Sequence, residues 1–129
     1  MIINETRLDV TIENHDFDFD GLNDEIDFFG KKNDIGERMI RNLQLAAEET
    51  VHRCITEFIE HNEGSGYPVD IVIEYSPENG TAKMTATYAG SRFDPFEYGD
   101  ELSLLIVEKL SAQANYTYDG TNRFTVELA

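Results

Sequence analysis

Residues 40–59 read IRNLQLAAEETVHRCITEFI and carry the most regular pattern in the chain. Apolar side chains recur there every three or four residues, a spacing that places them on one face of an α-helix. The run EGSG at residues 63–66 then supplies glycines of the kind that end helices. The stretch therefore predicts a long amphipathic helix that ends near residues 61–62 and packs its apolar face on a core. This face comprises Ile40, Leu43, Ala47, Val51, Cys54, Ile55, Phe58 and Ile59.

The segments before this helix predict a strand and a shorter helix. Apolar and polar residues alternate over residues 8–13, which is typical of a half-buried strand, and the alternation continues over residues 16–20. Residues 21–32 instead place Leu22, Ile26 and Phe29 at helical spacing, so we expect a short helix there.

The segments after the long helix predict two hairpins. Residues 69–75 and 82–88 alternate like strands, and PENG at residues 77–80 between them is a turn sequence. Residues 100–114 have helical spacing. Residues 116–128 then predict two short strands joined by a turn at DGTN.

This order of elements predicts an α+β fold in a single domain, residues 1–129. We expect a two-layer sandwich whose sheet is mixed but mostly antiparallel, with the helices on one face. No apolar run is long enough to span a membrane, and the first residues lack the basic and apolar regions of a signal peptide. We therefore expect a cytoplasmic protein.

The net charge limits the classes of partner that the chain is expected to bind. The 129 residues contain 26 acidic and 10 basic side chains, a net charge of −16. Such a chain repels nucleic acids and anionic membranes, so a basic protein surface or a cation is the better partner. The single cysteine, Cys54, excludes an internal disulfide and a multi-cysteine zinc site.

Three segments share their order and spacing with a known family. Residues 45–55, LAAEETVHRCI, look like a helix motif L-x-x-E-E-x-x-x-N, and residues 88–95, YAGSRFDP, look like a loop motif D-x-G-x-x-F-D-P. Residues 99–110, running on to Tyr116 and Asn122, look like a lid, a helix and a final hairpin. Together they resemble the histidine-kinase-like ATPase superfamily, and most closely its bacterial anti-sigma factor serine kinases.

The resemblance implies a nucleotide pocket whose chemical residues are replaced. Glu49 matches the family's glutamate, which polarises the attacking hydroxyl or water, whereas Arg53 stands where the family has a magnesium-binding asparagine. Tyr88 replaces the aspartate that reads adenine, and Gly90 keeps the turn. The second lid glycine is missing. The remnant pocket implied in this way comprises Glu49, Arg53, Tyr88, Gly90, Asp94, Gly99 and Asn122.

These replacements argue against ordinary kinase chemistry. Arginine has no lone pair to offer Mg²⁺, which prefers oxygen ligands. In the alternative register, Glu48 matches the glutamate and His52 takes the asparagine position, where it is an equally poor ligand. A chain of net charge −16 also repels a triphosphate. We therefore assign no residue a catalytic role, although Glu49 matches the family's base, and we expect no cofactor.

The function expected from the resemblance is a regulatory, protein-binding domain of the anti-sigma type. Its partner would be a sigma factor or an antagonist of the anti-sigma factor, with a homodimer possible. The alternative is an active or atypical serine protein kinase that binds ATP and Mg²⁺ and uses Glu49 as its base.

A second alternative is an acidic calcium-binding module. Asp16, Asp18, Asp20 and the following glycine spell D-x-D-x-D-G, the opening of a calcium loop, with Asp24 and Asp27 near the later ligand positions. A strand rather than a helix is expected before the run, however. The structural interpretation is a strand end whose phenylalanines enter the core, with Asp20 near a helix N-cap.

Overall fold

An antiparallel β-sheet forms one layer of the computed structural model, which describes residues 2–3, 6–13, 16–64, 68–97, 110 and 113–129. Its strands lie in the order β1-β2-β3-β4-β6-β5. Every described pairing is antiparallel, so the mixed character that we expected is not seen in this part of the chain. The strands are β1 (Ile2–Ile3), β2 (Arg7–Ile12), β3 (Val69–Ser76), β4 (Thr81–Tyr88), β5 (Gln113–Tyr118) and β6 (Asn122–Leu128).

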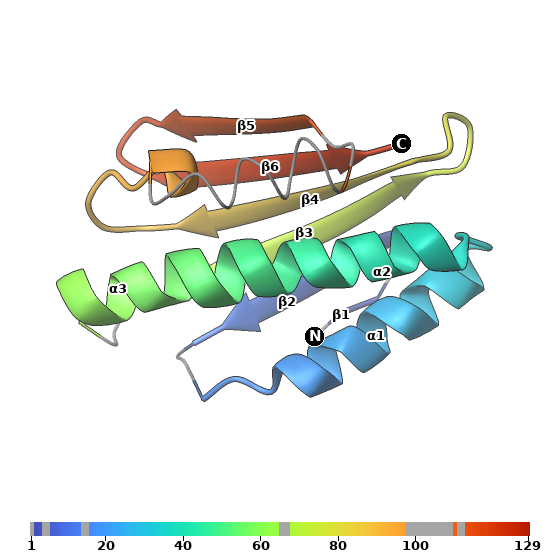
Figure 1. The fold of residues 1–129 in the computed structure, drawn as a ribbon, viewed down its shortest axis with the longest axis horizontal. Coiled ribbons are helices and arrows are strands. Elements are labelled where there is room, and N and C mark those ends of the chain that lie inside the picture. Colours follow the sequence, from blue (N-terminus) through green and yellow to red (C-terminus); the bar gives the residue numbers. More distant parts are fainter. Residues whose placement is uncertain (1, 4–5, 14–15, 65–67, 98–109, 111–112) are drawn as a thin grey trace.

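Two helical segments cover one face of this sheet (Figure 1). The first is α1 (Phe19–Lys32). The second, called the long helix below, runs without a break through α2 (Glu37–Ala46), η1 (Ala47–Thr56) and α3 (Glu57–Asn62), and η1 has π-helical hydrogen bonding. These layers confirm the α+β class and the long helix expected from residues 40–59.

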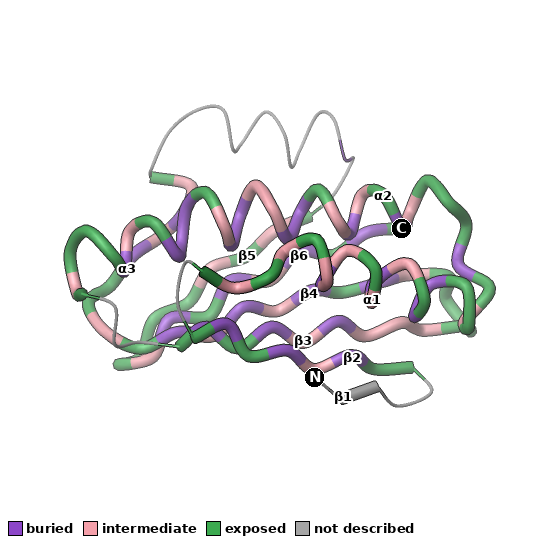
Figure 2. The backbone as a smooth tube through the Cα atoms, turned by 90° about the horizontal axis from the view of Figure 1, so that it is seen from below, coloured by how far each residue is buried: buried purple, intermediate pink, exposed green. Residues whose placement is uncertain are grey.

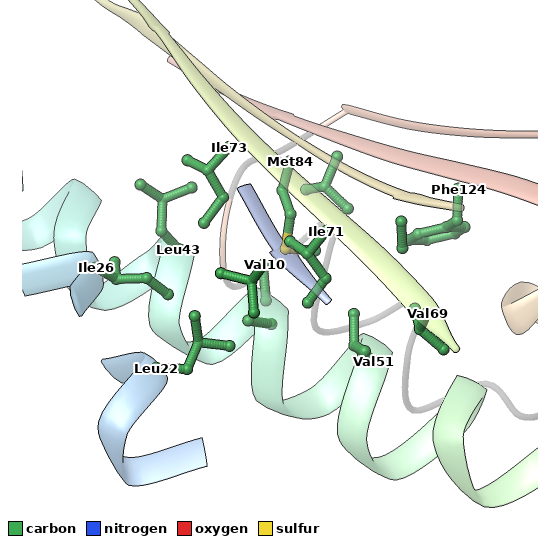
Figure 3. Packing of buried hydrophobic residues seen from close by; sticks show 14 of the residues in the cluster. Val10, Leu22, Ile26, Leu43, Val51, Val69, Ile71, Ile73, Met84 and Phe124 are labelled. Atoms are coloured by element: carbon green, nitrogen blue, oxygen red, sulfur yellow. The ribbon is translucent and has the colours of Figure 1, made fainter. Parts of the chain in front are cut away.

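The core lies between the sheet and the helices. Alternate strand residues such as Val10, Ile71 and Met84 point toward Leu22 of α1 and Leu43 of the long helix (Figure 3). Buried positions alternate with intermediate or exposed ones along β2, β3, β4 and β6 (Figure 2). The apolar face predicted for the long helix is buried throughout, apart from the half-buried Phe58.

The opposite face of the sheet is polar. Across one row, Arg7 of β2 lies opposite Glu74 of β3, which lies opposite Lys83 of β4 and then Glu127 of β6. Neighbouring strands therefore carry opposite charges at this row, an arrangement that favours this register by roughly 0.2–1 kcal/mol per pair.

The segment before α1 differs from our expectation. Residues 16–17 form a turn and a bend rather than a continuing strand, and α1 begins at Phe19. The reason is a helix cap: the Asp18 carboxylate accepts a hydrogen bond from the Gly21 N–H at 2.9 Å. Asp18 is therefore the N-cap in place of Asp20, which lies in the first turn.

The C-terminal elements agree with the expectation in part. The PENG turn is confirmed, with Gly80 at a φ of +66° and its N–H donating to the Ser76 carbonyl at 2.8 Å. Most of the helix expected over residues 100–114 lies outside the described residues. Its end is wrong, because Gln113 and Ala114 belong to β5, where Ala114 pairs with Val126.

Gly30 lets α1 and the long helix approach closely. A Cβ atom at this position would lie 2.4 Å from Cγ1 and 2.5 Å from Cδ1 of the buried Ile40. We predict that Gly30→Ala lowers the free energy of unfolding by about 1–3 kcal/mol through overpacking, although alanine favours helix.

A double-mutant cycle in urea checks this prediction. Ile40→Ala alone should cost about 2–5 kcal/mol, and the double variant should be more stable than the sum of the two single effects predicts. Strict additivity would show that the two side chains do not compete for this space.

Candidate functional site

The candidate site is built around the loop of residues 89–97, which follows β4 at one end of the sheet. Tyr88, the last residue of β4, is buried, and its hydroxyl donates a hydrogen bond to the Phe93 carbonyl at 2.6 Å. Gly90 has a φ of +98°, a left-handed conformation that favours glycine and turns the chain back. The tyrosine side chain thus lies beneath its own loop, which folds over it.

The buried amide of Asn122 holds the same loop from β6. Its Oδ1 accepts the Phe93 N–H at 2.9 Å, and its Nδ2 donates to the Ser91 carbonyl at 3.0 Å. The Tyr116 hydroxyl of β5 also accepts the Phe93 N–H, at 3.1 Å, and donates to Asn122 Oδ1. A buried amide is costly unless its polar atoms are paired, so this network fixes the loop on the sheet.

The long helix packs against the loop, and two of these contacts involve side chains of α3 and the residue that follows it. The rings of Phe58 and Phe93 stack with centroids 3.9 Å apart and planes inclined by 8°. At the end of α3, Glu63 accepts the Ser91 N–H at 2.9 Å. Hydrogen bonding from the Ser91 side chain, and then from its main chain, lowers the pKa of the Glu63 carboxyl. One of these two contacts is therefore apolar and the other is charged.

Asp94 stabilises a turn in the same loop. Its Oδ1 accepts the Phe96 N–H at 3.0 Å, and its carbonyl accepts the Glu97 N–H at 3.0 Å, which closes the 3₁₀ turn η2 (Pro95–Glu97). The Phe96 ring in turn packs on Phe124 of β6, with centroids 5.4 Å apart. The F-D-P part of the loop motif thus forms a compact turn against the sheet.

The surroundings of Tyr88 suit a neutral hydroxyl. Burial raises the pKa of Tyr88, and the nearby Tyr116, Asp94 and Cys54 raise it further. Burial, helped by Glu49 and Glu57, also raises the pKa of the Cys54 thiol to about 11. Both groups therefore stay protonated at neutral pH, and Cys54 is a poor nucleophile.

Glu49 and Arg53 lie one helical turn apart on η1 and form an ion pair. Arg53 Nε lies 3.5 Å from Glu49 Oε1, and the Arg53 side chain is 65% exposed. An exposed pair of this type contributes about 0.3–0.5 kcal/mol. With its carboxylate beside a fixed cation, Glu49 has a partner other than a metal ion.

The predicted pocket residues are thus only partly brought together. Tyr88 and Asn122 both hydrogen-bond Phe93, in the loop that also contains Gly90 and Asp94. Glu49 and Arg53 lie on η1 and pair with each other. Gly99 lies outside the described residues.

Sequence reasoning missed Phe58 and Glu63 as loop contacts. The spacing places Phe58 only on the apolar face of the long helix, and the glycines after Glu63 mark that residue only as a helix end. It also missed two buried hydroxyls of η1, Oγ1 of Thr50 and of Thr56, which have no hydrogen-bond partner within the described ranges. The residue types alone do not indicate a contact with the loop or a buried hydroxyl without a partner.

The aspartate run before α1 is arranged as a helix start. Asp18 caps α1, and Asp16 and Asp20 are exposed beside it. Phe17 packs edge-on against Phe19, which stacks on His52 of the long helix with centroids 4.1 Å apart. In the part of the chain that the structure describes, no three His, Cys, Asp or Glu side chains are grouped so as to hold a metal ion.

Comparison with protein-family models and with curated proteins finds no match to this chain. None of the helices among the described residues is long and apolar enough to cross a lipid bilayer.

The Tyr88 hydroxyl should contribute measurably to stability. We predict that Tyr88→Phe lowers the free energy of unfolding by about 1–3 kcal/mol, because it removes the buried hydrogen bond from the Tyr88 hydroxyl to the Phe93 carbonyl. Urea unfolding of the variant beside the wild type measures the loss.

Tyr118→Phe is the matched control. The Tyr118 hydroxyl lies 3.4 Å from the Gly90 carbonyl at an exposed position, so its removal should change stability by less than about 0.5 kcal/mol. Equal losses in the two variants would contradict the role given to Tyr88.

Proposed function

We propose that this chain is a regulatory, protein-binding domain of the anti-sigma type that lacks ordinary ATP-dependent kinase activity. The observation that carries the proposal is the position of Tyr88. In the family that the chain resembles, the residue at this position is an aspartate that binds the adenine amino group. In this chain the side chain is buried, and its only hydroxyl is donated to the Phe93 carbonyl at 2.6 Å. It therefore serves the protein's own loop.

The metal side of such a pocket is equally unfavourable. Arg53, at the position of the family's magnesium ligand, has donors only and lies beside Glu49. Phosphoryl transfer relies on Mg²⁺ to neutralise charge that develops on the phosphates. With a net charge of −16 and no oxygen ligand at this position, the domain lacks that means of holding a triphosphate.

Without nucleotide chemistry, the domain acts through surfaces that bind other proteins. The acidic surface favours a partner with a basic face, and we propose a sigma factor or an antagonist of the anti-sigma factor, with a homodimer as one possible assembly. An atypical serine kinase that uses Glu49 as base is the function against which the proposal is tested.

Calorimetric titration with ATP and ADP, each with and without Mg²⁺, tests the proposal. We expect no heat and no rise in melting temperature at millimolar nucleotide. A site with a dissociation constant of about 10 µM would stabilise the chain by about 2.7 kcal/mol at 1 mM ligand, so the two outcomes separate clearly.

Micromolar, magnesium-dependent binding would overturn the non-catalytic function, and loss of phosphoryl transfer in Glu49→Ala would then identify a kinase. The protein-binding half is tested by titrating purified sigma factors and their antagonists into the domain. Saturable binding that persists without nucleotide is the expected result, and binding that requires ATP would contradict it.

A further inference from the structure

We propose that the free edge of β5 binds an extended, uncharged or basic segment of the partner by strand addition. The inference rests on the proposed protein-binding function and names the surface and the kind of partner segment that fits it. Strand addition supplies affinity through main-chain hydrogen bonds and specificity through alternate side chains.

Among the described strands, β5 has a single neighbour. In the described sheet, β5 (Gln113–Tyr118) pairs with β6 and is the last strand in the order, at the outer edge in Figure 1. Main-chain N–H and C=O groups of a strand point alternately to its two sides, so half of those of β5 face away from β6. They form a row that another strand can pair with.

This edge lacks the features that natural sheets use to prevent pairing. The strand reads QANYTY, without a charged residue, a proline or a glycine. Its side chains at Gln113, Asn115 and Thr117 are exposed. By contrast, the other edge ends in β1, which has only two residues, and β2 beside it carries Arg7 and Asp9.

The net charge of the chain indicates which kind of segment binds at the β5 edge. A second copy of the chain brings a net charge of −16, and pairing two such copies edge to edge places like charges close together. An uncharged segment meets no such repulsion, and a basic segment is in addition attracted by the long-range field. An otherwise strongly acidic domain with a neutral edge therefore favours a partner strand of different composition.

Side chains at one end of β5 provide anchors of the types that dominate protein interfaces. Tyr118 is 42% exposed, and the Arg92 guanidinium lies 5.4 Å from the centroid of the Tyr116 ring. The Tyr116 hydroxyl also accepts the Phe93 N–H. A segment bound on this edge would therefore contact the strand that holds the loop of the candidate site.

A library of random twelve-residue peptides displayed on phage, selected against the full chain, tests the inference. We expect binders that carry no net negative charge and that slow hydrogen exchange at the outward-facing amides of β5. Each binder is then synthesised with alternate residues N-methylated, in two registers. One register should weaken binding about tenfold or more by removing the edge-facing donors, and the other should leave it nearly unchanged.

Two variants with the same added charge locate the site. Asn115→Lys places a lysine on the edge and should weaken peptide binding about tenfold, whereas Thr11→Lys, at an exposed position of β2, should change it less than about twofold. Circular dichroism confirms that both remain folded.

The proposal is overturned if no binder is found, if binders protect amides elsewhere, or if both N-methyl registers bind equally. A dimer of the free chain that Asn115→Lys dissociates would assign the edge to a second copy and would also overturn it. These outcomes are independent of the nucleotide titration, so a failure here is distinguishable from a failure of the proposed function.

Discussion

The buried amide of Asn122 constrains the structure at the end of the sheet where β4 meets the loop of residues 89–97. Because a buried amide must pair both its oxygen and its nitrogen, the loop has to present the Phe93 N–H and the Ser91 carbonyl to it. That requirement fixes Phe93 where its carbonyl receives the Tyr88 hydroxyl and where its ring stacks on Phe58 of the long helix. One polar side chain on β6 thus positions residues 91–93, to which Tyr88 and Phe58 also make contacts.

A tyrosine at residue 88 is physically coherent in this setting. A buried carboxylate would need a cation or several donors to offset its desolvation. A tyrosine instead contributes an apolar ring to the core and a single hydroxyl, which the loop satisfies internally. The loop is therefore stable without a ligand, and this links the local chemistry to the proposal of a domain that acts by binding proteins.

The sequence predicted the layers better than the site. The three- and four-residue spacing from Ile40 to Ile59 predicted the long helix, because burial on one face imposes that period. Alternation failed at residues 16–20, where the Asp18 side chain overrides the pattern by capping a helix. The same limit hid Phe58 and Glu63: which loop a helix residue meets depends on tertiary contacts between segments about 30 residues apart, and periodicity carries no information at that separation.

Native-state hydrogen exchange at the Phe93 amide tests the central claim most directly. Its N–H donates to Asn122 and to Tyr116, so we predict protection close to that of core amides such as Met84 on β4, with exchange through global unfolding. Exchange of the Phe93 amide as fast as that of the exposed Ala89 next to β4 would show that the loop opens freely. That result would contradict the account of a loop closed by Asn122 and Tyr88.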